Sequence, residues 1–242
     1  MADEVALVTG GATGIGAEVC RQLAASGARV ALCDVNERDG RQHAAAIGAT
    51  FIPCDVTRYD AFADAVATCE STLGVPTFVH LNAGIMTVPT GDAFLAIEAV
   101  SLEQYRRIMG VNLDGVFHGV KLLLPRMRVK GGAITITASI AGLGVLPIDP
   151  LYATTKYGLI GFGRSVAAAN ASGNVRINVL CPGVVDTGIV PDAFRTGAHG
   201  PMPPAVMAAE AVDLLRNGAN GEVRVKLRDR EAFAVGPTDL GA

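Results

Sequence analysis

The chain has 242 residues, of which 50% are hydrophobic and 18% are charged, and its formal net charge is -3. This composition excludes an intrinsically disordered protein, and a chain of this length can bury a large core without disulfides or metal ions. The slight acidity and the scattered lysines and arginines exclude an electrostatic nucleic-acid binder. We therefore expect a globular protein with a single domain over residues 1–242.

The compartment is predicted from the N-terminus, the apolar runs and the cysteines. Residues 1–4 include Asp3 and Glu4, where a signal peptide carries positive charge. The uncharged run 131–148 could cross a bilayer by length alone, but its four glycines and one proline favour a buried strand and loop. The five widely spaced cysteines are typical of reduced cytosolic thiols, without the spacing of a metal site. We expect a cytoplasmic protein with no membrane segment and no metal.

Short apolar segments alternate along the chain with longer segments of helical periodicity. The expected strands cover residues 5–9, 29–34, 50–54, 77–81, 133–138, 176–181 and 222–227. The expected helices cover residues 15–26, 38–47, 59–73, 102–126, 151–171 and 204–217. Uninterrupted apolar strands are typical of parallel sheets covered on both faces. The order predicts an α/β fold, a Rossmann-type doubly wound parallel sheet of about seven strands with helices on both faces. The proline- and glycine-rich segment 188–204 is the one we expect to be mobile.

A glycine-rich loop follows the first expected strand and reads Thr9-Gly10-Gly11-Ala12-Thr13-Gly14-Ile15-Gly16. Glycines permit a positive φ and remove side chains that would keep a pyrophosphate from the backbone N–H groups. The helix that begins near Ile15 presents its positive end to the same anion. A plain tight turn is the alternative, and the position between the first strand and the first helix favours a dinucleotide loop.

The second expected strand ends at Asp34, 18 residues after Gly16. A carboxylate at this place can accept hydrogen bonds from both ribose hydroxyls of an adenosine and repels a 2′-phosphate. Positions 10–16 and 35–37 hold no Arg or Lys, and Arg38 is the nearest cation. A simple cap on the following helix is the alternative role of Asp34. The pattern predicts NAD as the cofactor, not NADP.

Polar residues also follow the third and fourth expected strands. Asp55 comes after Cys54, and Asn82 begins the sequence Asn82-Ala83-Gly84. Ligands bind at the carboxyl ends of strands in open α/β sheets. Asp55 can therefore accept a hydrogen bond from an adenine amino group, and Asn82 is expected in the site, although it could be a turn residue only.

Four further residues could carry chemistry. Tyr152 and Lys156 are four residues apart near the start of an expected helix, so their side chains share one face. Ser139 lies just beyond the fifth expected strand, where a strand-end cap is the alternative role. Asn112 lies inside a long expected helix, where asparagine is a poor helix former and could merely mark a kink.

Together with the glycine loop, these residues resemble the short-chain dehydrogenase/reductase family. The resemblance runs from residues 9–16 through residues 82–84, Asn112, Ser139 and Tyr152 to residues 182–187. Within the family, residues 31–36, 140–143 and 152–187 look most like the NAD-dependent 15-hydroxyprostaglandin dehydrogenase branch. The resemblance implies that the cofactor contacts Gly10, Thr13, Gly14, Ile15, Gly16, Asp34, Asp55, Val56, Asn82, Ala83, Gly84, Tyr152, Lys156, Pro182, Gly183, Val185 and Thr187.

The resemblance also implies catalytic roles. Tyr152 would be the general acid/base, and Lys156 would lower the pKa of the phenol and hold the nicotinamide ribose. Ser139 would hydrogen-bond the substrate oxygen, and Asn112 would bind a water that links Lys156 to solvent. Thr187 would hydrogen-bond the carboxamide of the cofactor. The implied activity is the NAD-dependent interconversion of a secondary alcohol and a ketone.

Two departures from the family concern the substrate and the scaffold. Leu81 replaces an asparagine of many relatives, and Asp149 replaces an amide of the prostaglandin branch. We expect Asp149 at the pocket mouth, where its charge would disfavour acidic substrates. The expected substrate is a neutral, or else cationic, secondary alcohol with a hydrophobic body. The residues expected to shape its pocket are Met86, Val88, Leu146, Ile148, Ile189, Val190 and Phe194.

Two alternatives to this activity stay open. One is an NADPH-dependent carbonyl or 3-oxoacyl reductase, which Asp34 argues against. The other is a nicotinamide-sensing binding protein without turnover, which the complete set of catalytic residues argues against. In this family the two long helices pair across a two-fold axis, so a homodimer or homotetramer is expected.

Overall fold

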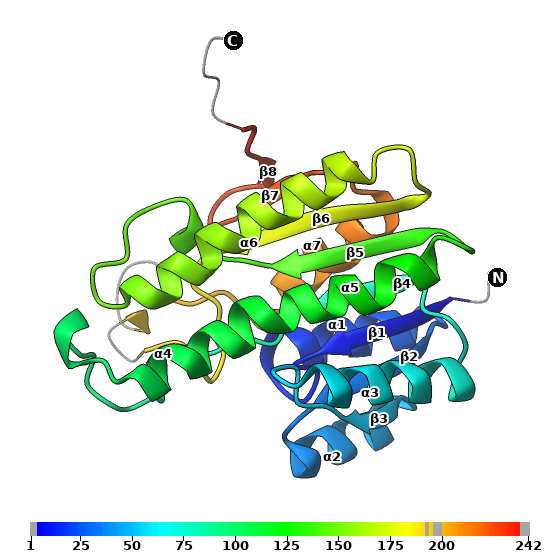
Figure 1. The fold of residues 1–242 in the computed structure, drawn as a ribbon, viewed down its shortest axis with the longest axis horizontal. Coiled ribbons are helices and arrows are strands. Elements are labelled where there is room, and N and C mark those ends of the chain that lie inside the picture. The colour runs from blue at the N-terminus through cyan, green and yellow to red at the C-terminus, as the bar shows by residue number, and fades with distance from the viewer. Residues whose placement is uncertain (1–3, 192–193, 196–199, 238–242) are drawn as a thin grey trace.

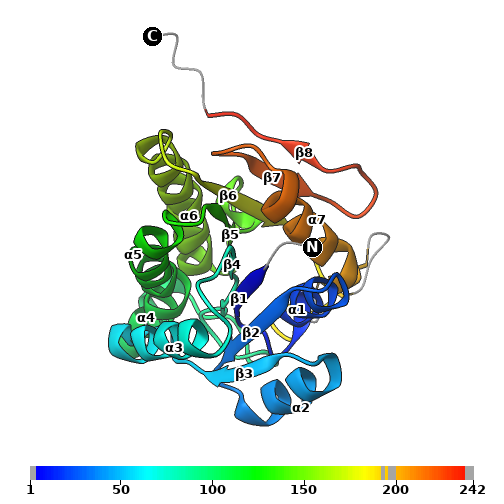
Figure 2. The same cartoon turned by 90° about the vertical axis from the view of Figure 1, so that its right-hand side faces the viewer.

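The computed structural model describes residues 4–191, 194–195 and 200–237. A sheet of eight strands, in the order β3-β2-β1-β4-β5-β6-β7-β8, lies between two layers of helices (Figures 1 and 2). The strands are β1 Val5–Thr9, β2 Arg29–Asp34, β3 Thr50–Pro53, β4 Phe78–Leu81, β5 Gly132–Thr137, β6 Val175–Pro182, β7 Val223–Lys226 and β8 Phe233–Ala234. The strand order reverses between β1 and β4, which opens a crevice at the carboxyl ends of these strands.

Seven of the strands run parallel, which confirms the predicted Rossmann-type sheet. The eighth, β8, pairs with β7 in the antiparallel sense through Val225 and Phe233. The sequence did not predict it, because both residues of β8 are exposed and form no buried apolar run.

Helices cover both faces of the sheet, as predicted. The main ones are α1 Gly14–Ala25, α2 Glu37–Ile47, α3 Tyr59–Thr72, α4 Leu102–Met109, α5 Gly115–Met127, α6 Pro150–Ala169 and α7 Pro204–Asn217. Apolar side chains of α3, α5 and α6 pack on one face of the sheet, and those of α1 and α7 pack on the other (Figure 2). The buried apolar strands β1, β4, β5 and β6 form the centre of both cores.

One expected helix is divided. Residues 102–126 form α4 and α5, which are joined by a π-helical turn over Gly110–Asp114. The wide turn centres on Asn112, whose amide bonds to the backbone of Ile85 instead of facing solvent. The sequence marked Asn112 as unusual in a helix, and the structure shows the local distortion that accompanies it.

Three expectations concern the whole chain. All five cysteines are free and buried. Within the described ranges, no helix has both the length and the apolar character needed to span a bilayer. Of the segment expected to be mobile, residues 192–193 and 196–199 lie outside the described residues.

Candidate active site

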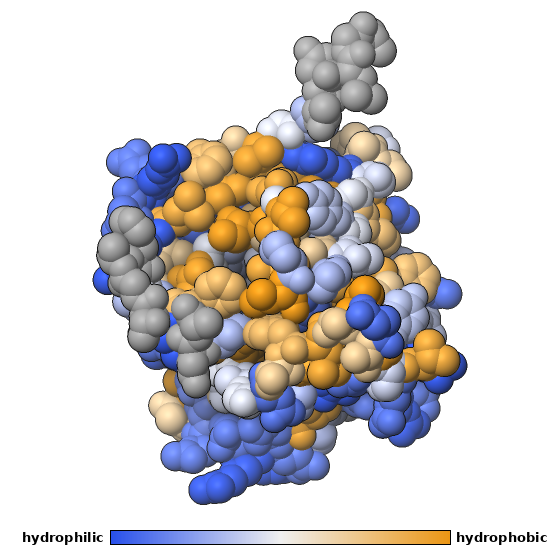
Figure 3. All heavy atoms as spheres, turned by 90° about the vertical axis from the view of Figure 1, so that its left-hand side faces the viewer, coloured by the Kyte–Doolittle hydropathy of each residue, from blue (hydrophilic) through white to orange (hydrophobic). Residues whose placement is uncertain are grey.

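A cavity of about 440 Å³ lies at the carboxyl edge of the sheet. Figure 3 views the molecule from this side, and apolar side chains gather over the middle of the face. The cavity is lined by residues at or just beyond the ends of β1 to β6, and by Tyr152 and Lys156 from α6. Sixteen of the seventeen residues predicted to contact cofactor, together with Ser139, line it; among the predicted site residues, Gly16 and Asn112 do not.

The glycine loop forms the floor of one half of the cavity. Gly10 and Gly14 adopt positive φ angles of 65° and 60°, which side chains rarely tolerate. A Cβ on Gly16 would lie 2.1 Å from the carbonyl oxygen of Gly10, so only glycine lets α1 approach the loop this closely. Gly16 therefore shapes the loop from beneath and does not line the cavity. Thr13 is the N-cap of α1 and makes no side-chain cap hydrogen bond, so the first N–H groups of the helix face an open site.

Two carboxylates lie at the far end of this half. The carboxylate of Asp34 accepts hydrogen bonds from the backbone N–H of Ala12 at 2.9 Å and of Asn36 at 2.8 Å. Oδ1 of Asp55 accepts hydrogen bonds from the N–H and the hydroxyl of Thr57, at 3.0 and 2.7 Å. Both side chains line the cavity from fixed positions, as a site for the hydroxyls and the amino group of an adenosine requires.

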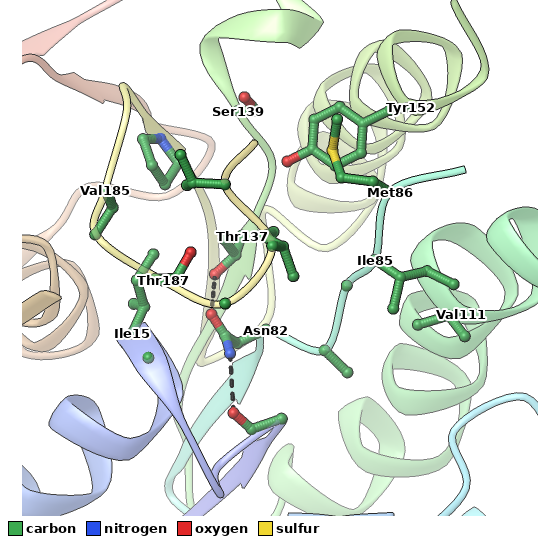
Figure 4. A pocket seen from close by; sticks show the side chains of 18 of the residues that line it. Ile15, Asn82, Ile85, Met86, Val111, Thr137, Ser139, Tyr152, Val185 and Thr187 are labelled. Atoms are coloured by element: carbon green, nitrogen blue, oxygen red, sulfur yellow. Dashed lines mark hydrogen bonds between the residues drawn. The ribbon is translucent and has the colours of Figure 1, made fainter. Parts of the chain in front are cut away.

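Asn82 joins three strand ends under the middle of the cavity. Its Nδ2 donates to the carbonyl oxygens of Thr9 and Gly10, both at 3.3 Å, and its Oδ1 accepts from the hydroxyl of Thr137 at 3.2 Å (Figure 4). The hydroxyl of Thr9 accepts from the backbone N–H groups of Asn82 and Ala83. Asn82 is thus a scaffold residue of the loop as well as part of the cavity wall.

The other half of the cavity contains the predicted catalytic side chains. Asp149 is the N-cap of α6 and accepts from the N–H of Tyr152 at 2.9 Å, and Lys156 follows one turn later. The phenol of Tyr152 and the hydroxyl of Ser139 lie on the same side of the cavity (Figure 4). Ser139 holds an extended backbone after β5, and its Oγ accepts from the N–H of Ala141. The end of β5 and the first turn of α6 therefore hold the hydroxyl of Ser139 and the phenol of Tyr152 on the same side of the cavity.

Burial shifts both titratable groups of this half away from the charged state. The pKa of Tyr152 is raised to about 12 in all, mainly by burial, while a hydrogen bond with Ser139 lowers it and the charge of Asp149 adds a smaller rise. Burial lowers the pKa of Lys156 to about 8. The Nζ of Lys156 donates to the carbonyl oxygen of Thr137 at 3.0 Å, which orients the ammonium group. A further positive charge near the phenol is needed to bring its pKa toward neutrality.

Asn112 lies behind the cavity. Its Oδ1 accepts from the N–H of Ile85 at 2.8 Å, and its Nδ2 donates to the carbonyl oxygen of Ile85 and to the hydroxyl of Thr155. A Cβ on Gly84 would lie 3.4 Å from Nζ of Lys156 and 3.6 Å from Oδ1 of Asn112. The two polar groups therefore flank the same small space, although they do not contact each other through a hydrogen bond.

The end of β6 and the segment that follows it supply the wall beside the glycine loop. Pro182, Gly183, Val185 and Thr187 all line the cavity. Val185 forms a backbone bridge with Met202, and a Cβ on Gly14 would lie 3.0 Å from the methyl group of Thr187. The wall and the glycine loop thus meet directly, as a clamp around an elongated ligand requires.

The structure corrects three expectations about the substrate pocket. Asp149 is 2% exposed and turned away from the pocket mouth, because its carboxylate caps α6 and accepts two hydrogen bonds from Thr87. It cannot repel an acidic substrate at the rim. Val88 and Ile148 line a separate small hollow, whereas Met86, Leu146, Ile189, Val190 and Phe194 line the cavity as predicted.

Sequence reasoning missed Thr137, which contributes its hydroxyl to Asn82 and its carbonyl oxygen to Lys156. A threonine inside a buried strand gives no functional signal by itself, because threonine is common in strands. Among the described residues, no group of three or more His, Cys, Asp or Glu side chains is placed to hold a metal ion.

Comparison with known proteins shows to which family the chain belongs. The family described as short chain dehydrogenase matches residues 4–197. The chain is 31% identical to trans-4-hydroxycyclohexanecarboxylate dehydrogenase of Sinomonas cyclohexanicum, over 89% of this chain and 85% of that protein. It is 35% identical to a 3-alpha-(or 20-beta)-hydroxysteroid dehydrogenase of Mycobacterium tuberculosis, over 80% of this chain and 75% of that protein. A 3-ketoacyl-(acyl-carrier-protein) reductase of Brucella melitensis, crystallised with NADH, superposes with a TM-score of 0.83 at 25% identity, over 93% of this chain and 95% of that one.

Proposed function

Because the chain belongs to the short-chain dehydrogenase family, we propose that it is an NAD-dependent oxidoreductase that interconverts a secondary alcohol and a ketone. One observation carries the proposal. A single cavity holds an adenosine-type carboxylate, Asp34, at one end and the set Ser139, Tyr152 and Lys156 at the other. Four glycines shape the loop over residues 9–16, and a Cβ on any of them would lie 3.0 Å or less from a neighbouring atom.

The residues at the catalytic end divide the work of proton transfer. The nicotinamide, when bound, supplies the hydride acceptor or donor. The phenol of Tyr152 takes the proton of the substrate hydroxyl during oxidation and returns it during reduction. Ser139 donates a hydrogen bond to the substrate oxygen, and the ammonium of Lys156 favours the charged phenolate. The space between Lys156 and Asn112 provides a place for a water that carries the proton onward.

The preference for NAD over NADP rests on Asp34. Its carboxylate is held by two backbone N–H groups at the end of β2, where a 2′-phosphate would meet like charge. The relative crystallised with NADH is consistent with this preference. Arg38 lies on the exposed first turn of α2 and does not line the cavity.

The substrate end of the cavity favours a neutral molecule with an apolar body. Met86, Leu146, Ile189, Val190 and Phe194 line it. Among the described lining residues the only charged side chains are Asp34, Asp55 and Lys156. Lys156 is the one cation among them, and its Nζ already donates to the carbonyl oxygen of Thr137, so the lining holds no further cation for a substrate carboxylate. Two relatives are named for a hydroxycyclohexanecarboxylate and a hydroxysteroid, both ring-bearing alcohols. These names support the ring, whereas the absence of a carboxylate rests on the cavity lining alone, because the first named substrate carries one. The proposed substrate is a neutral alicyclic secondary alcohol.

A homodimer or homotetramer is also part of the proposal. Leu102 and Tyr105 on α4, Phe117 on α5 and Tyr157 on α6 are exposed in the single chain. Such a group of large apolar side chains on neighbouring helices is typical of an interface with another copy. Light scattering of the purified protein measures the oligomeric state, and a monomer would contradict this part.

The proposed activity is tested with a panel of secondary alcohols offered with NAD and NADP in parallel. The panel pairs each ring-bearing neutral alcohol with its carboxylate analogue. We expect reduction of NAD with the neutral members, and a kcat/KM at least about tenfold lower for the carboxylates. Faster turnover with NADP would favour the carbonyl reductase alternative. NAD binding without turnover of any member would favour the sensor.

A further inference from the structure

The buried carboxylate of Asp149 caps the helix that carries the catalytic tyrosine, and it has no role in the proton transfer described above. Asp149 is 2% exposed and accepts three hydrogen bonds. Thr87 provides two of them, from its N–H at 2.9 Å and from its hydroxyl at 2.6 Å, and the N–H of Tyr152 provides the third at 2.9 Å. The described residues offer this carboxylate no ion pair, so its charge is compensated by hydrogen bonds and by the N-terminus of α6.

Thr87 connects this carboxylate to the wall of the substrate end. It is 4% exposed and directly follows Met86, which lines the cavity and packs with Tyr152 in one apolar cluster. The carbonyl oxygen of Thr87 accepts from a guanidinium nitrogen of Arg107 on α4 at 3.0 Å. The segment that carries Met86 is therefore fixed to α6 on one side and to α4 on the other.

We propose that Asp149 is a positioning residue, which joins the helix of the catalytic tyrosine to the substrate wall and sets the proton affinity of the phenol through its charge. The proposal rests on the proposed function, in which Tyr152 is the general acid/base. Its hydrogen bonds fix where the phenol stands relative to Met86. Its negative charge opposes the formation of the phenolate, and this is the direction in which the pKa of Tyr152 is raised.

The other charged groups around the phenol are few. Lys156 lies on the same helix, with Nζ 5.3 Å from the centre of the phenol ring. Arg107 reaches the carbonyl oxygen of Thr87, not the phenol. The other described neighbours of Tyr152, from the end of β5, the segment 85–86 and α4, have uncharged side chains, among them Ser139 and Ile108. Asp149 is therefore the described carboxylate whose removal should change the ionisation of Tyr152 most.

Two kinds of variant separate charge from position. Asp149→Asn removes the charge and keeps the size, and Asp149→Ser is a second neutral variant that still caps a helix and serves if the first does not fold. Thr87→Val is the matched control, because it removes one hydrogen bond to the carboxylate and keeps its charge. All variants are measured as the full-length protein with NAD.

The first readout is the pH profile of kcat/KM for alcohol oxidation. In both neutral variants the acidic limb of the profile, where Tyr152 becomes protonated, should move to lower pH by about half a pH unit to one pH unit. At a pH below this limb, kcat/KM relative to its plateau should therefore rise about three- to tenfold. Thr87→Val should leave the limb in place and raise KM. If the limb of the neutral variants stays in place, and their kcat and KM change as in Thr87→Val, Asp149 is only a helix cap and the inference is wrong.

The second readout needs no substrate. The chain has four tyrosines, so 13C labelling of the phenol carbons gives few signals, and Tyr152→Phe assigns the one of interest. The neutral variants should titrate this signal at lower pH than the wild type. If Tyr152→Phe still turns over, the proposed function fails, while this signal continues to report whether Asp149 acts on the phenol.

Discussion

Lys156 lies one helical turn after Tyr152 on α6, with its Nζ 5.3 Å from the centre of the phenol ring and 3.0 Å from the carbonyl oxygen of Thr137. The last residue of β5, Thr137, therefore orients the ammonium beside the proposed general base. Burial lowers the pKa of the ammonium to about 8 and raises that of the phenol to about 12. The charged ammonium favours the charged phenolate, and the phenolate favours the ammonium, so removal of one group changes the ionisation of the other.

Cofactor choice should follow the charge at the end of β2. Asp34→Ser removes the carboxylate that would meet a 2′-phosphate, so we expect the ratio of kcat/KM for NADP to that for NAD to rise about ten- to a hundredfold. Parallel initial-rate measurements with the two cofactors provide the ratio. Asp55→Asn is the control, because Asp55 is proposed to bind the adenine that both cofactors share, so this variant should weaken both cofactors alike. An unchanged ratio in Asp34→Ser would remove the argument for NAD.

The glycine loop should tolerate no side chain at its helix end. Gly16→Ala places a Cβ 2.1 Å from the carbonyl oxygen of Gly10 and 2.7 Å from Nδ2 of Asn82, so the loop must move. We expect the affinity for NAD, measured by calorimetry, to fall at least about a hundredfold. Gly161→Ala is the matched control inside α6, where a Cβ meets no described atom within 4 Å. It should leave the affinity unchanged and raise the free energy of unfolding by about 0.5–1 kcal/mol.

Stability should fall in mild acid because of one buried histidine. His80 is fully buried, its Nε2 lies 3.3 Å from the hydroxyl of Thr137, and its Nδ1 has no hydrogen-bond partner among the described residues. Burial lowers its pKa from 6.5 to about 4. Below pH 6.5 His80 therefore binds a proton in the unfolded chain but stays neutral in the folded protein until the pH approaches 4. The free energy of unfolding is therefore unaffected by His80 above pH 6.5 and falls progressively as the pH is lowered toward 4.

The size of this loss can be measured by urea unfolding at pH 7 and pH 5. Between these values the wild type should lose about 1–2 kcal/mol more than His80→Gln, which cannot titrate and can still donate to Thr137. Equal losses in the two proteins would show that another group causes the acid sensitivity.

Local patterns predicted most of the fold and most of the cavity lining. Tyr152 and Lys156 lie on one face of α6 because a spacing of four is about one helical turn. Asp34 and Asn82 lie at the same edge of the sheet because parallel strands end there. These relations need only the local element and the fold class.

Other relations depend on partners far away in the sequence. Asp149 turns inward because Thr87, 62 residues earlier, offers its carboxylate two hydrogen bonds. The π-helical turn at Asn112 depends on the backbone of Ile85, which lies 27 residues earlier. No periodicity or spacing within one element carries such information, so a rim position for Asp149 was the wrong prediction.

In the proposed mechanism Tyr152 performs the proton transfer, and the site binds NAD without the help of its hydroxyl. Tyr152→Phe removes one oxygen atom and keeps the ring that packs against Met86. Calorimetric titration with NAD should give an affinity within about twofold of the wild type, while NAD reduction with the best alcohol of the panel should fall at least about a thousandfold. Turnover that persists in Tyr152→Phe near the wild-type rate would show that another group transfers the proton.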